Sequence, residues 1–273
     1  MMTKNTPSYL LQVGDADRER LEILAELYNP GSQAFLQTQL SATALAAPRT
    51  MLDIGCGHGQ MALWLAQHVH SSKIVGIDIS DAQLVICNQK KAEQERSNVQ
   101  FLNHDITSDR LDHPLFDVAY CRFLLMHLKN WDGFFNNTLA ACKSGGSIFI
   151  EEPAFPFFCY PESPALRRAN VLGNQLSTMA GLNFDCIGPL WDYIQGLDVD
   201  ICAVKFSQPA LTSHREKSLL WRSFHQIKDS LLSTKLATMS DVEEILRDLD
   251  AVARDPQCIV GGLRVIQIHI KKR

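Results

Sequence analysis

The chain has 273 residues, 46% of them hydrophobic and 21% charged, an ordinary globular composition that excludes extensive disorder and low complexity. Its formal net charge of -4 at pH 7 offers no general attraction to nucleic acid. Because no apolar stretch reaches membrane-spanning length and residues 1–13 lack the apolar core of a secretory signal, we expect a soluble, cytoplasmic protein without nucleic-acid or membrane partners.

The amino-terminal part predicts a helical cap followed by the first strand of a sheet. Apolar residues at helical spacing predict a helix over Asp15 to Tyr28, which Asn29-Pro30-Gly31 should break. A second helix is expected over Ser32 to Ala47. The run Thr50 to Ile54 predicts a strand, and the glycine-rich segment after it should open a helix over Gln60 to His68.

Strands and helices then alternate, which is typical of a parallel sheet covered on both faces. The expected strands are Lys73 to Ile79, Asn98 to Asn103, Phe116 to Cys121 and Ser147 to Glu151. One helix should begin at a capping box from Ser80 to Gln83 and run to about Arg96, and another should span Trp131 to Cys142. We predict a doubly wound, Rossmann-like α/β fold.

The second half of the chain predicts additions to this fold. Residues 153–161 are rich in proline and aromatic residues and should form a connector without regular structure. Further elements are expected over Ser163 to Ala180 (helix), Pro189 to Gln195 (helix) and Val199 to Phe206 (strand), followed by two long helices, the second capped from Ser240. The last strand, Gly262 to Ile270, alternates isoleucines with Gln267 and His269, as an antiparallel strand near a sheet edge does.

These elements predict one domain built on a seven-stranded, mostly parallel sheet with an antiparallel last strand. Within it we expect a helical cap (residues 1–48), a cofactor-binding core (49–152) and acceptor-side additions (153–273). The eight cysteines are scattered and form no CxxC pair, so metal and redox motifs are unsupported. The oligomeric state stays open.

The segment Met51 to Gly59 carries the strongest functional signal. An apolar strand ends in an acid, Asp53, and is followed directly by three alternating glycines, Gly55, Gly57 and Gly59. Glycine lets the backbone turn tightly and approach a ligand, and the helix that follows presents free N–H groups. Asp53 would repel a pyrophosphate but attract an ammonium or sulfonium, so the segment favours S-adenosylmethionine over a dinucleotide.

Three further signals follow the ends of later strands, where open α/β sheets bind ligands. Asp78 ends the second strand, where a carboxylate can accept hydrogen bonds from two ribose hydroxyls. His104-Asp105-Ile106 follows the third strand and suits an adenine amino group beside an apolar contact. The fourth signal is the segment Phe116 to Arg122, which contains the fourth strand, with the apolar run Phe123 to Leu128 after it.

The order and spacing of these signals resemble the class I S-adenosylmethionine-dependent methyltransferases, over about Tyr9 to Glu152. The resemblance implies that Gly55 to Gly59 contact the methionine part of the cofactor and that Asp78 holds the ribose. It also implies an antiparallel last strand in the sheet. The cofactor-binding residues expected from motif and resemblance together are Tyr9, Asp53, Gly55, Cys56, Gly57, Gly59, Asp78, Ile79, Asp105, Ile106, Cys121 and Arg122.

The remaining assignments also follow from the resemblance. Asp105 and Ile106 would hold the adenine, although an Asx turn is an alternative role for Asp105. Cys121 and Arg122 would line the sulfonium side, although Arg122 could instead pair with a surface carboxylate. Tyr9 would lie on a segment that folds over the cofactor.

The sequence further favours a small organic methyl acceptor. The fourth strand is followed by Cys121-Arg122-Phe123-Leu124 and not by the Asn/Asp-Pro-Pro-aromatic signature of enzymes that methylate exocyclic amines of nucleobases or protein glutamine. Direct displacement depends mainly on alignment in a dry pocket, and a hydroxyl acceptor would still need proton removal. The catalytic candidates are His127 and Glu151, with Glu152 beside the latter. Their alternatives are a structural histidine and a solvated strand-end charge.

The aromatic residues Phe155 to Tyr160, Trp221 and Phe224 indicate an apolar acceptor chamber, or else simply core packing. Two other functions stay open. A nicotinamide-dependent oxidoreductase would share the glycine loop and Asp78, but its pyrophosphate favours GxGxxG spacing. A catalytically silent protein that binds the cofactor and serves as an interaction partner is the third hypothesis.

Overall fold

The computed structural model describes residues 17–41, 49–69 and 72–273. The helices are α1 (Arg18–Ser41), α2 (Gln60–His68), α3 (Asp81–Glu93), α4 (Trp131–Ala141), α5 (Pro164–Met179), α6 (Ile187–Gln195), α7 (His214–Ser233) and α8 (Met239–Arg254), with a short 3-10 helix η2 (Leu125–His127). None of the helices in these ranges combines the length and apolar character that a membrane crossing needs.

The strands form two sheets. They are β1 (Thr50–Ile54), β2 (Lys73–Asp78), β3 (Val99–Asn103), β4 (Phe116–Arg122), β5 (Cys142–Ala154), β6 (Phe158–Tyr160), β7 (Val199–Ser207), β8 (Ala210–Leu211), β9 (Ile259–Gly261) and β10 (Arg264–Lys272). The large sheet has seven strands in the order β3-β2-β1-β4-β5-β10-β7, and β6-β9-β8 form a small one. Strands β1 to β5 pair in parallel, whereas β10 is antiparallel to both β5 and β7. The predicted seven-stranded, doubly wound sheet with an antiparallel last strand is therefore confirmed.

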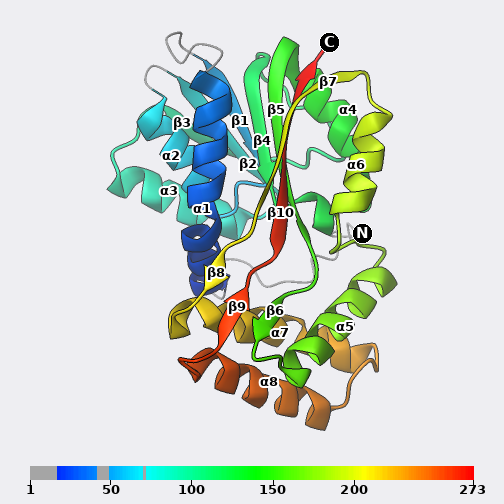
Figure 1. Ribbon diagram of the computed structural model, residues 1–273. Coiled ribbons are helices and arrows are strands. Elements are labelled where there is room, and N and C mark those ends of the chain that lie inside the picture. The colour runs from blue at the N-terminus through cyan, green and yellow to red at the C-terminus, as the bar shows by residue number, and fades with distance from the viewer. Residues whose placement is uncertain (1–16, 42–48, 70–71) are drawn as a thin grey trace, which may run out of the picture.

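Helices cover both faces of the large sheet (Figure 1). On one face, Phe35 and Leu36 of α1 share a buried cluster with residues of α2 and with Phe149 of β5. On the other face, Phe134 of α4 and Leu190 of α6 pack in a second buried cluster on β1, β4 and β5. Strands buried on both faces read as nearly continuous apolar runs, which is why the sequence predicted them well.

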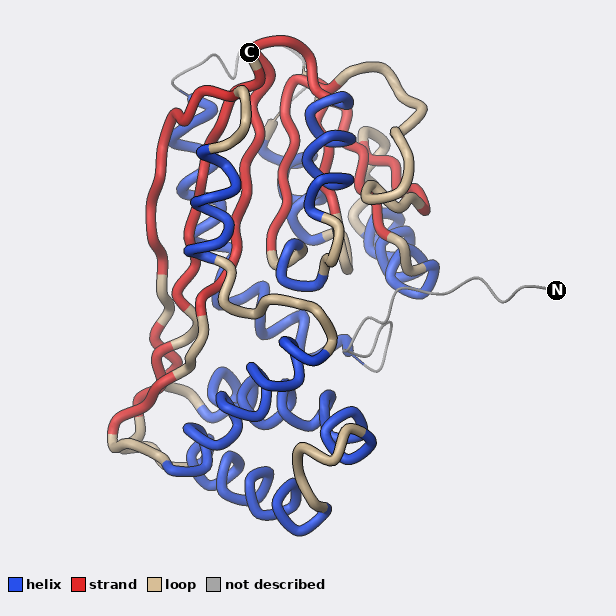
Figure 2. The backbone as a smooth tube through the Cα atoms, turned by 90° about the vertical axis from the view of Figure 1, so that its right-hand side faces the viewer, coloured by secondary structure: helices blue, strands red, loops and turns tan. Residues whose placement is uncertain are grey.

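A helical lobe, composed of α5, α7 and α8, lies beyond the carboxyl ends of the parallel strands (Figures 1 and 2). A third cluster of buried residues lies in this lobe and joins α7 and α8 to α5 and to the start of β10. In α8, Val242, Ile245 and Leu249 are buried at helical spacing and form one apolar stripe. The lobe and the strand ends therefore face each other across the region where α/β sheets bind ligands.

Helix α1 differs from its prediction, because Asn29-Pro30-Gly31 does not break it and one helix runs from Arg18 to Ser41. A proline inside a helix costs about 3 kcal/mol. Burial offsets this cost, because Tyr28 and Phe35 on either side are almost fully buried and each contributes about 1.5–3 kcal/mol. The helix packs in the cluster of the helical lobe before the proline and on the large sheet after it, so the predicted break between two helices is wrong.

The connector after β5 is also more regular than predicted. Residues 158–160 form β6, which pairs with β9, a segment about 100 positions later in the chain. A side chain at Gly261 would lie 2.2 Å from the ring of Phe158, so the glycine makes room for that ring. The pairing depends on a distant partner, which local patterns do not reveal.

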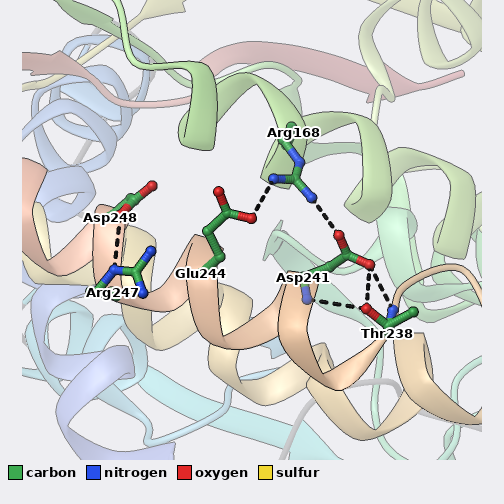
Figure 3. A network of polar contacts seen from close by, with 6 residues as sticks. All are labelled: Arg168, Thr238, Asp241, Glu244, Arg247 and Asp248. Carbon is green, nitrogen blue, oxygen red and sulfur yellow. Dashed lines mark hydrogen bonds and ion pairs between the residues drawn. The ribbon is translucent and has the colours of Figure 1, made fainter.

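The cap of α8 lies two residues earlier than predicted. Thr238, not Ser240, is the N-cap: its Oγ1 accepts from the backbone N–H of Asp241, and the Asp241 carboxylate accepts from the backbone N–H of Thr238 at 3.0 Å. The same carboxylate accepts from Arg168 of α5 at 2.7 Å, which ties the start of α8 to α5 (Figure 3). Because this contact joins two helices far apart in the sequence, the local pattern around α8 does not reveal it.

Strand β10 lies one strand in from the sheet edge, because β7 pairs with its outer side. Its polar residues Gln267 and His269 are therefore buried. A ring nitrogen of His269 lies 3.0 Å from the Ser147 hydroxyl, and the ring stacks on Phe149. The polar alternation thus places buried groups, among them the hydrogen-bonded His269, inside the sheet and not on a solvent-exposed face.

Candidate active site

The glycine loop joins β1 to α2 and presents bare backbone to an open space. Gly55, Gly57 and Gly59 have φ of 68°, 53° and 69°, a left-handed conformation that favours glycine. The N–H groups of Gly55 and Cys56 donate to the carbonyl of Ile77 in β2, which fixes the loop on the sheet. A Cβ added at Gly57 would meet no atom within 4 Å, so that part of the loop is free for a ligand.

Asp53 lies at the floor of this space with an unsatisfied carboxylate oxygen. Its side chain is buried, and Oδ2 accepts no hydrogen bond from the described residues. Burial raises the pKa of Asp53 to about 7, and the Arg122 guanidinium only partly offsets this. A buried acceptor without a partner is costly, so the geometry suits a ligand that brings a cation or N–H donors to Asp53.

Asp78 connects the second strand to the glycine loop. Its Oδ2 accepts from the N–H of Gly57 at 3.0 Å, and its Oδ1 accepts from the N–H of Ser80 at 2.9 Å. Ser80 in turn caps α3 by accepting from the N–H of Gln83, as predicted, so Asp78 is not needed as the cap. Each carboxylate oxygen has a second lone pair with which to accept from a diol.

Asp105 and Ile106 extend the same edge of the site. Asp105 forms an Asx turn, because Oδ1 accepts from the backbone N–H and the hydroxyl of Thr107 and Oδ2 accepts from Ser108. Burial acts to raise the pKa of Asp105, but these hydrogen bonds outweigh it and hold the pKa below its usual value. Ile106 is buried in the wall beside it.

Successive residues of β4 point to opposite faces of the sheet, and this separates Cys121 from Arg122. Arg122 lines the cavity described below and donates to Asn29 Oδ1 at 2.7 Å and Ser32 Oγ at 2.8 Å, both on α1. Cys121 packs in the apolar cluster under α4 and does not line the cavity. The strand period turns the Cys121 side chain away from the cavity, so the structure does not bring it together with the other expected cofactor residues.

A single cavity of about 1180 Å³ runs between the strand ends and the helical lobe. One end is lined by the polar residues just described, together with Ile79 and Cys56. The other end is lined by apolar residues of α1, α5, α7 and the segment after β5. Pockets for one small ligand span about 300–1,000 Å³, so this cavity has room for two molecules side by side.

Known proteins resemble the part of the chain that builds the polar end. A family model described as a methyltransferase domain matches residues 52–148. The chain is 28% identical over 116 residues to pavine N-methyltransferase of Thalictrum flavum subsp. glaucum, covering 42% of this chain and 32% of that protein. It is 29% identical over 124 residues to a ubiquinone biosynthesis O-methyltransferase of Coxiella burnetii, covering 45% of this chain and 50% of that protein.

The fold is shared as well. The structure of coclaurine N-methyltransferase bound to N-methylheliamine and S-adenosylhomocysteine matches with a TM-score of 0.54 at 17% identity, over 88% of this chain and 72% of that one. Residues 52–148 carry a methyltransferase domain, and the fold is the Rossmann-like one of class I methyltransferases. It spans about a third to a half of the length of the two curated relatives.

The residues of this methyltransferase domain fit the cofactor of its family. The unpartnered Oδ2 of Asp53 and the open space at Gly57 suit the charged methionine part, and Asp78 has acceptor capacity for the ribose. Tyr9, the softer candidate, lies outside the described residues. The nicotinamide-dependent alternative is set aside, because the family model matches the glycine loop and Asp78 together.

His127 lines the methyltransferase cavity from η2, at the boundary between its polar and apolar ends. Burial, with a smaller effect of the Arg20 cation, lowers the pKa of His127 to about 3. The imidazole is therefore neutral at pH 7. It can accept a hydrogen bond from an acceptor molecule, but its pKa lies well below the operating pH that suits a general base.

Glu151 and Glu152 do not line the cavity. Glu151 is buried beneath α1, and its Oε2 accepts from the hydroxyl of Ser32 at 2.5 Å. Glu152 accepts from the backbone N–H groups of Leu124 and Leu125 at 2.8 and 2.7 Å, which fixes the start of η2. Neither carboxylate lines the cavity, so the geometry gives Glu151 a structural role in place of the expected catalytic one.

Sequence reasoning missed several groups that line the cavity. Arg20 of α1 reaches it while its guanidinium donates to both oxygens of Asp17, at 2.6 and 2.5 Å. His58, between two of the loop glycines, is buried in the same wall. Nothing in the local sequence marks Arg20, but His58 could have been recognised from its place within the motif.

Proposed function

We propose that this protein transfers the methyl group of S-adenosylmethionine to a small organic acceptor that occupies the apolar end of the cavity. The observation that carries the proposal is one continuous cavity with an unpartnered buried carboxylate at one end and an apolar chamber at the other. The curated relatives are named for small-molecule N- and O-methylation, which supports a small acceptor.

The lining residues indicate which part of the cofactor each of them would bind. Bound S-adenosylmethionine supplies an electrophilic methyl group on a sulfonium. Asp53 binds the cationic end of the donor, Asp78 accepts from its ribose, and Ile106 packs on the adenine, with Asp105 holding the turn. Arg122 positions α1 over the site through Asn29 and Ser32.

The helical lobe supplies the second half of the proposed site. Residues of α5 and α7, including Gly173 and Phe224, line the acceptor end. This supports a division in which residues 49–152 bind the donor and residues 153–273 bind the acceptor, with the segment before residue 49 as a cap. Closure by apolar side chains excludes water, so that alignment of donor and acceptor lowers the barrier.

Calorimetry and product analysis test this function. Titration with S-adenosylhomocysteine should show one binding site, and NAD⁺ at the same concentration should show none. Incubation with S-adenosylmethionine and a panel of small acceptors should then release S-adenosylhomocysteine. Binding without turnover across the panel would favour a catalytically silent cofactor-binding protein, and failure to bind S-adenosylhomocysteine would reject the proposal altogether.

A further inference from the structure

The acceptor end of the cavity, here called the acceptor chamber, has an aromatic wall. It is lined by His127, Phe155, Phe157, Gly173, Phe184 and Phe224. The ring of Phe184 stacks on Phe155 with centroids 5.7 Å apart and makes a T-shaped contact with the ring of His127, also with centroids 5.7 Å apart. Flat, apolar molecules fit such a wall through offset and edge-to-face contacts.

The charges around the cavity are distributed unevenly. Among the described residues that line it, the carboxylates are Asp53, Asp78 and Asp105, and all three lie at or just after the ends of parallel strands, at the polar end of the cavity. The cations Arg20 and Lys129 also line the cavity, Arg20 close enough to act on His127. Asp17, which holds Arg20, is buried but does not line the cavity.

This distribution bears on the acceptor group. A substrate ammonium in the acceptor chamber would lose its hydration and find no described carboxylate there, which is costly. Phenylalanine rings can attract a cation, but Arg20 opposes this. An oxygen that develops negative charge gains from Arg20, and the neutral His127 imidazole can accept a hydrogen bond from its hydroxyl.

We propose that the methyl acceptor is an uncharged, flat and largely apolar molecule that bears an acidic hydroxyl, a phenol or enol, and is methylated on that oxygen beside His127. In the reaction the acidic hydroxyl loses its proton to bulk water as the acceptor enters, the acceptor oxygen then bonds to the methyl carbon, and the carbon–sulfur bond breaks with its electron pair left on sulfur. This inference rests on the proposed methyl transfer, but its test is separate from that of donor binding.

Three probes with one skeleton test the acceptor class. Binding of 2-naphthol, 2-naphthylmethylamine and 2-naphthoate is measured by calorimetry at pH 7 on the full chain saturated with S-adenosylhomocysteine. We expect 2-naphthol to bind at least tenfold more tightly than the other two. Equal or tighter binding of the amine or of the carboxylate, or no binding of any probe while S-adenosylhomocysteine binds normally, overturns the inference. Failure of S-adenosylhomocysteine to bind instead rejects the proposed function.

Chamber-filling variants locate the bound probe. A Cβ at Gly173 would meet Phe155 and Ile227 at 3.9 and 4.0 Å, an ordinary contact, so the extra atoms of Gly173→Leu extend into the acceptor chamber. We expect at least a tenfold loss of 2-naphthol affinity with S-adenosylhomocysteine affinity unchanged within twofold. Val171→Leu, at an exposed position of the same helix, is the matched control.

A second filling variant comes from another wall, in case Gly173→Leu does not fold. Ser223 of α7 also lines the cavity, and Ser223→Leu should produce the same selective loss. S-adenosylhomocysteine affinity reports whether each variant is folded. If a folded variant binds 2-naphthol as the unaltered protein does, the hydroxyl compound does not occupy the acceptor chamber and the inference fails.

Discussion

At the scale of single residues, the site depends on which polar groups have partners and which do not. Glu151 accepts from Ser32 and Glu152 accepts from backbone N–H groups, and neither lines the cavity, so both serve the fold. Asp53 keeps one oxygen without a hydrogen bond from the described residues. In a buried site that oxygen costs stability until a ligand arrives, which is the usual relation between stability and function at a binding site.

Replacing Asp53 should therefore stabilise the ligand-free protein and weaken donor binding. The pKa of Asp53 is about 7 in the folded protein against 3.8 for the unfolded group, so the folded state binds more protons between these values. Stability then falls as the pH rises from about 4 to about 7. Asp53→Asn should raise Tm at pH 8 by a few degrees, with little change at pH 4, in thermal denaturation scans.

The same variant should lose at least tenfold in S-adenosylhomocysteine affinity by calorimetry. Asp109→Asn, at an exposed position in the loop after β3, is the matched control and should change neither quantity. A lower Tm at pH 8 for Asp53→Asn, or an unchanged affinity, would contradict the role given to this carboxylate.

Donor binding itself should depend on pH through Asp53. A ligand cation favours the ionised carboxylate, so below pH 7 binding must first remove a proton from Asp53. The dissociation constant of S-adenosylhomocysteine should rise as the pH falls from 8 to 5, by up to about tenfold per unit below pH 7. Calorimetry across this pH range measures the change in the dissociation constant. If Asp53→Asn shows the same pH dependence as the unaltered protein, another group is responsible for it.

Ser32 tests the buried polar contacts between α1 and the sheet. Its hydroxyl donates to Glu151 and accepts from Arg122, so Ser32→Ala leaves both groups short of a partner. We expect a loss of about 1–3 kcal/mol in the free energy of unfolding, measured by denaturant titration. Ser233→Ala removes an exposed hydroxyl that bonds only to its own helix in the described structure, and it should cost far less.

At the scale of elements, the helices are specified partly by local pattern and partly by their neighbours. The stripe of α8 was readable from apolar spacing, but its cap was not, because Thr238 and Ser240 are both capping residues placed two positions apart. Pro30 shows the reverse effect. A proline normally ends a helix, but packing on both sides of Pro30 keeps α1 continuous. Caps and breaks are therefore the parts of an element that tertiary contacts decide most often.

The pair Thr238 and Ser240 gives a direct comparison. Thr238→Ala removes the N-cap of α8 and one partner of Asp241, so we expect unfolding free energy to fall by about 1 kcal/mol. Ser240→Ala lies inside the helix and should change stability by less than about 0.5 kcal/mol. Denaturant unfolding of the two variants distinguishes them, and a larger loss for Ser240→Ala would favour the cap position that the sequence pattern indicated.

At the scale of the whole molecule, the ligand cavity is the boundary between the sheet and the helical lobe. Both parts contribute lining residues, and α1 and β10 contribute to the buried cluster of the lobe. A bound ligand thus contacts both parts and adds its binding energy to the folded state of the whole chain.

Thermal denaturation should show this stabilisation. S-adenosylhomocysteine at 100 times its dissociation constant stabilises the folded state by about 2.7 kcal/mol, which corresponds to a rise in Tm of about 5–10 °C. NAD⁺ at the same concentration should leave Tm unchanged. Two separate transitions, only one of them shifted by the ligand, would show that the lobe unfolds independently of the sheet.

The donor end of the site was largely predictable from the sequence. Asp53, the three glycines and Asp78 lie at strand ends, and parallel strands bring successive carboxyl ends to one edge of the sheet. Their positions therefore follow from local pattern plus one topological rule. Cys121 shows the limit of this reasoning, because an error of one residue along a strand reverses the face.

By itself, the sequence determined the alternation of strands and helices, the glycine loop and the resemblance to one methyltransferase family, since each depends on residues close together in the chain. Only the tertiary structure decided that α1 continues through Pro30, that β6 pairs with β9, that Glu151 faces Ser32, and which side chains of α5 and α7 line the acceptor chamber. Those contacts join residues a hundred or more positions apart, or depend on packing energies larger than a local propensity, so no short stretch of sequence records them.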